Sequence, residues 1–261
     1  MDLHLQQKVI IVTGGYSGIG EAIVRESAKE GAIPVIVGRS AERGKQLETE
    51  LKAAGYDCLA VAAELSSQTE CQKAVEQILA HYGKIDSLVN NAGINDGVGL
   101  ENGSPDRFMD SIRNNVYHYY CMAHYALPAL KQSPGASIIN ISSKTGVTGQ
   151  GGTSAYVVSK AGQLGLTREW AVELLPYGIR VNAVVPAEVW TPLYERWVNT
   201  FPDPQEKLAS ITKNIPLGKR MTTSEEIAWT TLFLISDRAA HITGQHIYPD
   251  GGYTHLDRAI E

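Results

Sequence analysis

The stretch KVIIVTGGYSGIG, residues 8–20, decides the fold. It begins with an apolar run of strand length, continues through closely spaced glycines, and is followed by the helical pattern EAIVRESAKEG. A strand, a glycine-rich turn and a helix N-terminus together make a phosphate site. The glycines let the backbone approach a pyrophosphate, and the free N–H groups of the first helical turn meet its charge. The stretch therefore predicts a dinucleotide-binding unit at the start of the chain.

Beyond this stretch, strand-like apolar runs alternate with helical patterns. The predicted strands lie at 9–12, 34–37, 58–64, 87–93, 136–142, 179–185 and 246–251. The alternation predicts an α/β fold, a single-domain Rossmann-type doubly wound parallel sheet over residues 1–261 with helices on both faces. Residues 188–220 interrupt the alternation with two tryptophans and four prolines, which is typical of a lid or substrate loop.

Composition and charge narrow the class of protein. The net charge of −5 argues against a general role on nucleic acid or on a membrane surface. The three cysteines have no CxxC spacing, which predicts reduced thiols, and the seven histidines are too scattered to predict a metal site. The first residues lack the features of a signal peptide, and no run approaches the ~18 apolar residues of a membrane span. We expect a cytoplasmic protein that uses no metal.

Tyr156 and Lys160 form a Tyr-x-x-x-Lys pair, and Ser143 lies 13 residues before the tyrosine. Residues four apart share one face of a helix, although chance also produces this spacing on ordinary amphipathic helices. A phenol with a pKa of about 10 is a poor base at neutral pH, and a neighbouring cation stabilises its phenolate. The pair predicts an acid/base site in which the Ser143 hydroxyl holds a substrate oxygen.

With these motifs in view, the chain resembles the short-chain dehydrogenase/reductases over essentially its whole length. The matching motifs are TGGYSGIG (13–20), NNAG (90–93), ISSKTG (141–146), YVVSK (156–160), RVNAVVP (180–186) and DGG (250–252). The resemblance implies hydride transfer with NAD(P) by a tetrad of Asn115, Ser143, Tyr156 and Lys160. In this scheme Tyr156 is the acid/base, Ser143 orients the substrate oxygen, and Lys160 lowers the tyrosine pKa and holds the nicotinamide ribose. Asn115 anchors a proton-relay water, and Ser142 is the alternative to Ser143.

The tip of the second predicted strand indicates which cofactor is used. Sites that prefer NAD place a carboxylate there, roughly 20 residues beyond the glycines. This chain has Gly38 at that position, followed by Arg39 and Ser40, so no acid repels a 2′-phosphate and a guanidinium can clasp one. NADP is the predicted cofactor, with NAD as the alternative. The residues assigned to the cofactor are Gly14, Tyr16, Ser17, Gly18, Ile19, Gly20, Arg39, Ser40, Glu64, Leu65, Asn91, Ala92, Gly93, Tyr156, Lys160, Pro186, Val189 and Thr191.

The segments 142–156 and 186–198 resemble bacterial L-fucose dehydrogenases, which oxidise the anomeric hydroxyl of L-fucose and related aldoses to a lactone. A sugar pocket needs hydrogen-bonding groups and a flat apolar face. The residues assigned to a sugar are Asn95, Ser143, Lys144, Gln150, Tyr156, Glu188, Trp190 and Trp197. For Lys144 and Glu188 the alternative is a solvated surface position, and for Trp197 it is lid packing or a subunit contact.

Other functions remain open at this point. The substrate could be a 3-oxoacyl thioester, a steroid or another polyol, because one fold hosts many activities. A cofactor-sensing regulator could share the fold, although a regulator has no need of the intact tetrad. The resemblance also implies a homotetramer.

Overall fold

The computed structural model describes residues 1–256, and its centre is one parallel sheet of seven strands. The strand order is β3-β2-β1-β4-β5-β6-β7. The strands are β1 Val9–Thr13, β2 Ile33–Gly38, β3 Leu59–Ala62, β4 Ser87–Asn90, β5 Ser137–Ile141, β6 Arg180–Val184 and β7 His246–Ile247. The order reverses between β1 and β4, which is where a doubly wound sheet opens a crevice at the carboxyl ends of its strands. The predicted fold class is confirmed.

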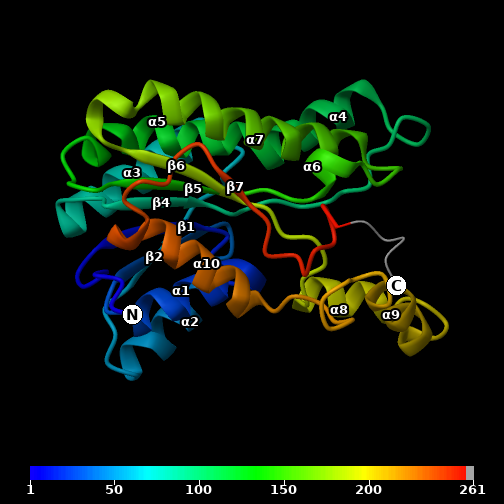
Figure 1. Cartoon of the computed structure of the whole chain (residues 1–261). Coiled ribbons are helices and arrows are strands. Elements are labelled where there is room, and N and C mark those ends of the chain that lie inside the picture. Colours follow the sequence, from blue (N-terminus) through cyan, green and yellow to red (C-terminus); the bar gives the residue numbers. More distant parts are fainter. Residues whose placement is uncertain (257–261) are drawn as a thin grey trace.

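Helices cover both faces of the sheet (Figure 1). α1, α2 and α10 lie on one face, and α3, α5 and α7 lie on the other. The helices are α1 Gly18–Lys29, α2 Ala41–Ala53, α3 Gln68–Tyr82, α4 Pro105–Ile112, α5 His118–Leu130, α6 Thr145–Thr148, α7 Ser154–Glu173, α8 Pro192–Val198, α9 Pro204–Thr212 and α10 Ser224–Ile235.

The central strand β1 contributes side chains to the hydrophobic cores on both faces of the sheet. Side chains alternate across a strand, so Val9 and Ile11 enter the core under α3, α5 and α7, whereas Ile10 and Val12 enter the core under α1 and α10. All four are fully buried. Burying a side chain of this size stabilises a fold by about 1.5–3 kcal/mol, so the apolar run that signals the strand also anchors both layers of helices.

Three predicted strands run two or more residues past the carboxyl ends of the observed ones, and after β3 and β4 the chain leaves the sheet to line the crevice. The run 87–93 ends as a strand at Asn90. The next residue, Asn91, turns back to β1, and its side-chain amide donates to the backbone oxygen of Thr13 at 2.9 Å. The runs 58–64 and 246–251 likewise end as strands at Ala62 and Ile247.

The helix that carries Asn115 is interrupted. α4 and α5 are joined by the π-helical turn Arg113–Tyr117, in which Asn115 is fully buried. Single π turns inside helices occur often at functional sites. The turn points the Asn115 side chain at the loop after β4, where its Oδ1 accepts from the backbone N–H of Ile94 at 2.7 Å.

The segment 188–220 forms α8 and α9, which extend beyond the sheet near the carboxyl ends of the strands (Figure 1). Its two ends are held together by a short parallel bridge between Val189 and Thr222. The Trp190 backbone N–H donates to the Thr222 oxygen at 2.9 Å, and the Thr222 N–H donates to the Glu188 oxygen at 3.0 Å. Residues 188–220 therefore form a loop whose two ends are joined by this bridge.

Candidate active site

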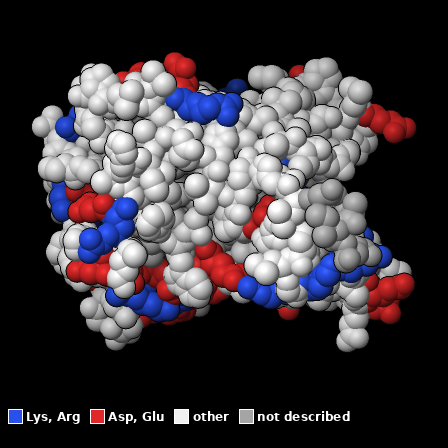
Figure 2. All heavy atoms as spheres, viewed as in Figure 1, with Lys and Arg blue, Asp and Glu red and all other residues white. Residues whose placement is uncertain are grey.

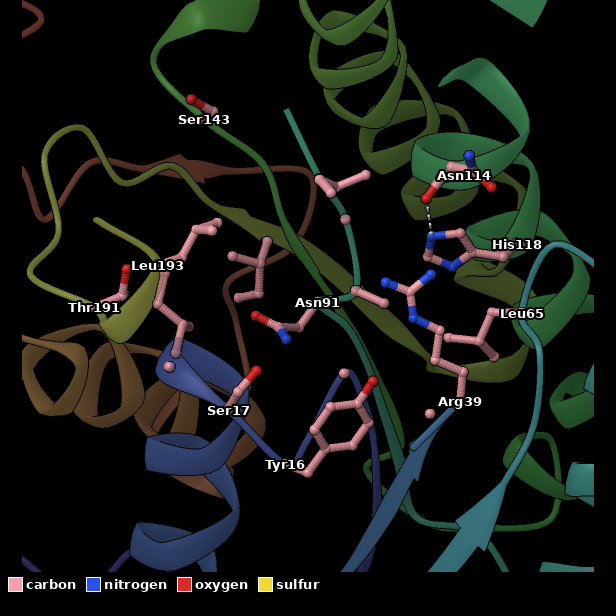
Figure 3. A pocket seen from close by; sticks show the side chains of 18 of the residues that line it. Tyr16, Ser17, Arg39, Leu65, Asn91, Asn114, His118, Ser143, Thr191 and Leu193 are labelled. Carbon is pink, nitrogen blue, oxygen red and sulfur yellow. Dashed lines mark hydrogen bonds between the residues drawn. The ribbon is translucent and has the colours of Figure 1, made fainter. Parts of the chain in front are cut away.

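A cavity of about 780 Å³ opens at the switch point, outside the carboxyl ends of β1 and β4 (Figure 3). The turn at Tyr16 and Ser17 and the tip of β2 at Arg39 form one end of its wall. Ser143 lies at the opposite end of the view, and Thr191 and Leu193 close one side. The cavity thus runs from the glycine turn to the predicted catalytic residues, as a dinucleotide followed by a substrate requires.

The glycine turn leaves the first turn of α1 uncapped. Ser17 occupies the N-cap position but its side chain accepts no capping hydrogen bond, so the first N–H groups of α1 face the cavity end unpaired with a side chain. Gly14 and Gly18 have φ of +65° and +54°, a region that favours glycine. A Cβ on Gly20 would lie 2.2 Å from the Gly14 oxygen, so this glycine permits close packing of the turn on α1. These features fit a pyrophosphate.

Gly20 is the one predicted cofactor residue outside the cavity wall; the other predicted positions all line it.

Thr13 holds the loop after β4 in place beside the glycine turn. Its Oγ1 accepts from the backbone N–H groups of Asn91 and Ala92 at 2.9 and 3.1 Å. This fixes the loop after β4 against β1, where the two strands diverge.

The tip of β2 carries no acid and has no room for one while Tyr16 stays in place. A Cβ on Gly38 would lie 2.3 Å from Cε1 of Tyr16. Arg39 is exposed and points into the cavity (Figure 3), and Arg43 also lines it. The Ser40 hydroxyl caps α2 by accepting from the Arg43 N–H at 3.4 Å. This end of the cavity is therefore basic.

Glu64 lies on the rim of the same end. Its Oε1 accepts from the backbone N–H and the hydroxyl of Ser66, at 3.1 and 2.9 Å. These hydrogen bonds, led by the backbone one, lower the pKa of the Glu64 carboxyl, and the charge of Arg39 adds to the effect. The carboxylate is held in its ionised form where an adenine amino group could donate to it.

Tyr156, Lys160 and Ser143 converge as predicted from their spacing. The Lys160 Nζ lies 5.5 Å from the centre of the Tyr156 ring. Burial raises the pKa of Tyr156 to about 12, and a hydrogen bond with the Ser143 side chain opposes that rise. Burial also lowers the pKa of Lys160 to about 7. The pKa of Tyr156 is raised because loss of water around the phenol outweighs the hydrogen bond with Ser143.

The structure separates the two candidate serines. The Ser142 hydroxyl donates to the backbone oxygen of Lys160 at 2.8 Å, so it is committed to the helix that carries the lysine. The Ser143 hydroxyl accepts from the Thr145 hydroxyl at 3.1 Å and bonds Tyr156. The geometry favours Ser143 as the group that meets a substrate oxygen.

Asn115 does not line the cavity. Its Nδ2 donates to the Ser111 backbone oxygen at 2.9 Å while its Oδ1 holds the N–H of Ile94. Its own backbone oxygen accepts from Nε2 of Gln163 at 2.7 Å. The residue therefore supports the loop at Gly93 and Ile94 from behind.

The predicted sugar residues other than Ser143 and Tyr156 lie outside the cavity wall. Lys144 and Glu188 instead form a partly buried ion pair with each other, and the Tyr194 hydroxyl donates to Glu188 Oε2 at 2.7 Å. The Lys144 Nζ lies 3.8 Å from the centre of the Tyr253 ring. We call Lys144, Glu188, Tyr194 and Tyr253 the ion-pair cluster. It joins the loop after β5, which carries Ser143, to the base of α8.

The remaining predicted sugar residues are exposed. Asn95 accepts from the Gly97 N–H at 3.2 Å within its own loop, and Gln150 lies on the loop after α6. Trp190 and Trp197 flank the Tyr194 ring at 6.5 and 5.2 Å between centres, and Trp197 also contacts Phe201. Both tryptophans pack within the α8 segment, which is the alternative that the sequence left open for Trp197.

The cavity also includes residues that sequence reasoning missed. They are Arg43, Ala63, Ser66, Ile94, Asp96, Asn114, His118, Ile141, Ala187, Pro192, Leu193, Tyr194 and Arg196. Most neighbour a predicted residue in sequence. His118 lies three residues from the nearest predicted residue. It is buried, and its Nε2 lies 3.1 Å from the Asn114 backbone oxygen (Figure 3). Burial, with the charge of Lys160 adding to it, lowers the pKa of His118 to about 4, so the ring is neutral at neutral pH.

Two further findings concern residues 1–256. Their His, Cys, Asp and Glu side chains form no group of three that could hold a metal ion. Every helix in this part of the chain is too short or too polar to cross a lipid bilayer. On the face shown in Figure 2, basic and acidic side chains are interspersed around a largely uncharged centre.

Comparison with known proteins identifies the family. A family model described as enoyl-(acyl carrier protein) reductase matches residues 14–254. The chain belongs to the short-chain dehydrogenase/reductase family of oxidoreductases, which use NAD(P). An L-fucose dehydrogenase from Bos taurus is 34% identical over 94% of this chain and 88% of that protein. A 3-oxoacyl-[acyl-carrier-protein] reductase from Thermotoga maritima is also 34% identical, over 96% of this chain and 99% of that protein.

Solved structures agree with this assignment. Cj0485 dehydrogenase superposes with a TM-score of 0.94 and is 48% identical, covering 100% of this chain and 99% of that one. An aldohexose dehydrogenase from Thermoplasma acidophilum has a TM-score of 0.89 and 31% identity, covering 99% and 98%. L-Sorbose reductase from Gluconobacter frateurii, solved with NADPH and L-sorbose, has a TM-score of 0.94 and 28% identity, covering 98% and 100%.

Proposed function

We propose that this protein is an NADP(H)-dependent oxidoreductase that oxidises the anomeric hydroxyl of L-fucose and related aldoses to the lactone. The observation that carries the proposal is the convergence of Ser143, Tyr156 and Lys160 at one end of a cavity whose other end is the glycine turn. A hydroxyl, a phenol and an ammonium together can orient an alcohol and take its proton.

The residues of this chain divide the work as follows. The first turn of α1 and Gly14 would hold the pyrophosphate, and Lys160 would hold the nicotinamide ribose. When bound, NADP⁺ supplies the acceptor for the hydride that leaves C1 of the sugar, together with a positive charge. Ser143 donates to the anomeric oxygen and Tyr156, as phenolate, accepts the hydroxyl proton. C1 loses a hydride and its oxygen loses a proton, which leaves the C=O of the lactone.

Three observations favour NADP over NAD. Gly38 keeps an acid away from the 2′ position, and packing by Tyr16 excludes any side chain there. Arg39 and Arg43 line that end of the cavity and could clasp a 2′-phosphate. The similar fold of L-sorbose reductase was solved with NADPH.

Two lines of support favour a sugar. Relatives named L-fucose dehydrogenase and aldohexose dehydrogenase match nearly the whole chain. In the ion-pair cluster, Lys144 follows Ser143 in the sequence and Tyr194 lines the cavity, so the Tyr194 hydroxyl could meet a ring hydroxyl. We further propose that residues 188–220 act as the substrate loop, because Pro192, Leu193 and Tyr194 line the cavity.

A second candidate is reduction of a 3-oxoacyl thioester. It is supported by the Thermotoga maritima reductase, which is as similar in sequence as the bovine L-fucose dehydrogenase. Tyr156 would then donate a proton to the ketone oxygen, with Ser143 and Lys160 in the same roles, and the bound NADPH would supply the hydride to the ketone carbon.

A panel of L-fucose, D-arabinose and L-galactose with NADP⁺ and with NAD⁺ tests the proposal, read as absorbance of the reduced nicotinamide. We expect turnover of these aldoses, faster with NADP⁺. Tyr156→Phe is the control, because it should keep NADP⁺ binding while turnover falls by about 10²–10⁴-fold, the usual contribution of acid–base catalysis. No turnover of any of the three sugars, alongside reduction of a 3-oxoacyl thioester by NADPH, would replace the first candidate with the second.

A further inference from the structure

The Lys160 ammonium donates a hydrogen bond to Gln163, a residue that none of the sequence motifs includes. Gln163 lies one turn further along α7 and is fully buried. Its Oε1 accepts from Lys160 Nζ at 3.2 Å, and its Nε2 donates to the backbone oxygen of Asn115 at 2.7 Å. One amide thus connects the lysine of the acid/base pair to the π turn.

The orientation of this amide is determined by its neighbours. Lys160 can only donate, and the Asn115 backbone oxygen can only accept. If the amide were flipped, its NH₂ would face the ammonium and its oxygen would face the carbonyl. Because Gln163 is buried, neither mismatch could be relieved by water, so a single orientation is enforced.

A hydrogen-bonded network fixes the backbone of Gln163 as well. The Thr167 hydroxyl donates to the Gln163 backbone oxygen at 2.8 Å and accepts from Asn140 Nδ2 at 2.9 Å. Asn140 in turn accepts from Asn90 at 3.1 Å. The network ties α7 to β5 and β4, and all its members are fully buried.

Gln163 takes up one of the N–H donors of the Lys160 ammonium. An ammonium has three N–H donors. One goes to the Ile141 backbone oxygen at 2.9 Å and a second goes to Gln163. These two contacts leave one donor for the cavity, where Tyr156 and a bound ribose would meet it.

We propose that Gln163 is a positioning residue of the active site, which aims the Lys160 ammonium at the cavity and couples its orientation to the π turn at Asn115. The assignment rests on the proposed function only in taking Lys160 as a catalytic residue. Without Gln163 the ammonium loses one of its two protein acceptors, and its protonated form loses support.

The titration of Lys160 reports this contact directly. The titratable groups that face the amine are Tyr156 on its own helix, and Tyr119 and His118 on α5, with the Tyr119 ring centre 6.0 Å from Nζ. Gln163 also hydrogen-bonds Tyr119, but burial raises the pKa of Tyr119 well above 10, so this phenol stays neutral while the lysine titrates. A shift in the lysine titration therefore arises from the lost or altered amide.

The experiment follows Lys160 by NMR in protein labelled with ¹³C at lysine Cε, with the signal assigned by Lys160→Met. Gln163→Met keeps the length of the side chain and removes both hydrogen bonds, so the pKa of Lys160 should fall by about one unit or more. Gln163→Glu places a carboxylate beside the amine and should raise that pKa by about one unit or more. Thr167→Val, which breaks the same network without contacting Lys160, is the matched control and should leave the pKa unchanged.

A fall in the Lys160 pKa in Gln163→Met, with no change in Thr167→Val, supports the positioning role, since a purely structural role would make the two variants alike. A Lys160 titration identical to that of the wild type in either variant would overturn the proposal. If Gln163→Met does not fold, the sign of the shift in Gln163→Glu decides. The titration needs no substrate, so its failure is distinct from failure of the proposed function, which the aldose panel tests separately.

Discussion

At the scale of single residues, burial acts on Tyr156 and Lys160 in opposite directions. It raises the pKa of the phenol to about 12 and lowers that of the amine to about 7, so near neutral pH the phenol is protonated and the amine is close to its midpoint. A phenolate base therefore needs further positive charge in the cavity, which NADP⁺ would bring. On this account the base becomes active only when the cofactor is bound.

Burial destabilises the charged form of Lys160, and this predicts how the free energy of unfolding depends on pH. Its folded pKa of about 7 lies below the ordinary value of 10.5, so between these values the unfolded chain holds a proton that the folded chain releases. The contribution of Lys160 to the free energy of unfolding should rise with pH across this window, by at most about 1.4 kcal/mol per pH unit.

Urea unfolding of the wild type and of Lys160→Met at several pH values measures this contribution. The wild-type free energy of unfolding minus that of the variant should increase from about pH 7 to about pH 10.5. A difference that stays flat or falls over this range would show that the buried amine is not destabilised in its charged form.

The sequence predicted which side chains lie together where their spacing along the chain determines it. The spacing of Tyr156 and Lys160 brought both side chains to one place, and a glycine at position 38 left that end of the cavity without an acid. The role of Gln163 gave no such signal, because a glutamine in a helix reads as a surface residue until its burial is known.

At the scale of elements, the base of α8 is held against the loop after β5, which carries Ser143, by the ion-pair cluster. Lys144 follows Ser143 directly, and its partner Glu188 begins the segment that carries α8. The sequence indicated both residues through their loops, but not that they pair with each other, because the contact joins segments 44 residues apart. We expect this pair to hold the substrate loop against the cavity.

Glu188→Gln tests the fastening. The substitution removes the charge opposite the partly buried Lys144, so the free energy of unfolding should fall by about 1–3 kcal/mol, and amide hydrogen exchange in α8 should speed up. Glu195→Gln changes an exposed residue of the same helix and should stay within about 0.5 kcal/mol of the wild type. Equal effects of the two substitutions would contradict the fastening.

At the scale of the whole molecule, the alternation of strands and helices followed from the sequence pattern, and helices on both faces of the sheet (Figure 1) keep apolar side chains exposed. Tyr120 on α5 and Val158 and Val172 on α7 expose 53%, 50% and 68% of their surface, and Trp229 on α10 exposes 56%. Large exposed apolar areas on a folded chain mark interaction surfaces. Helices on both faces of the sheet are therefore available for contacts between copies.

We expect a homotetramer in solution, since two separate surfaces can close a symmetric assembly. Sedimentation equilibrium at micromolar concentration should give four times the mass of one chain. Charged substitution of Val158 and Val172 together should then produce smaller species. A monomer at all concentrations would remove the tetramer and leave the single-chain site unaffected, because Ser143, Tyr156 and Lys160 all come from one chain.

We propose that a hydride passes from the anomeric carbon of an aldose to NADP⁺ at this site. The most direct measurement uses L-fucose deuterated at C1, with mass spectrometry of the reduced cofactor and of the sugar product. We predict one deuterium in NADPH and none in the lactone, with both signals lost in Tyr156→Phe. Formation of NADPH without deuterium would place the oxidation at another carbon and contradict the account.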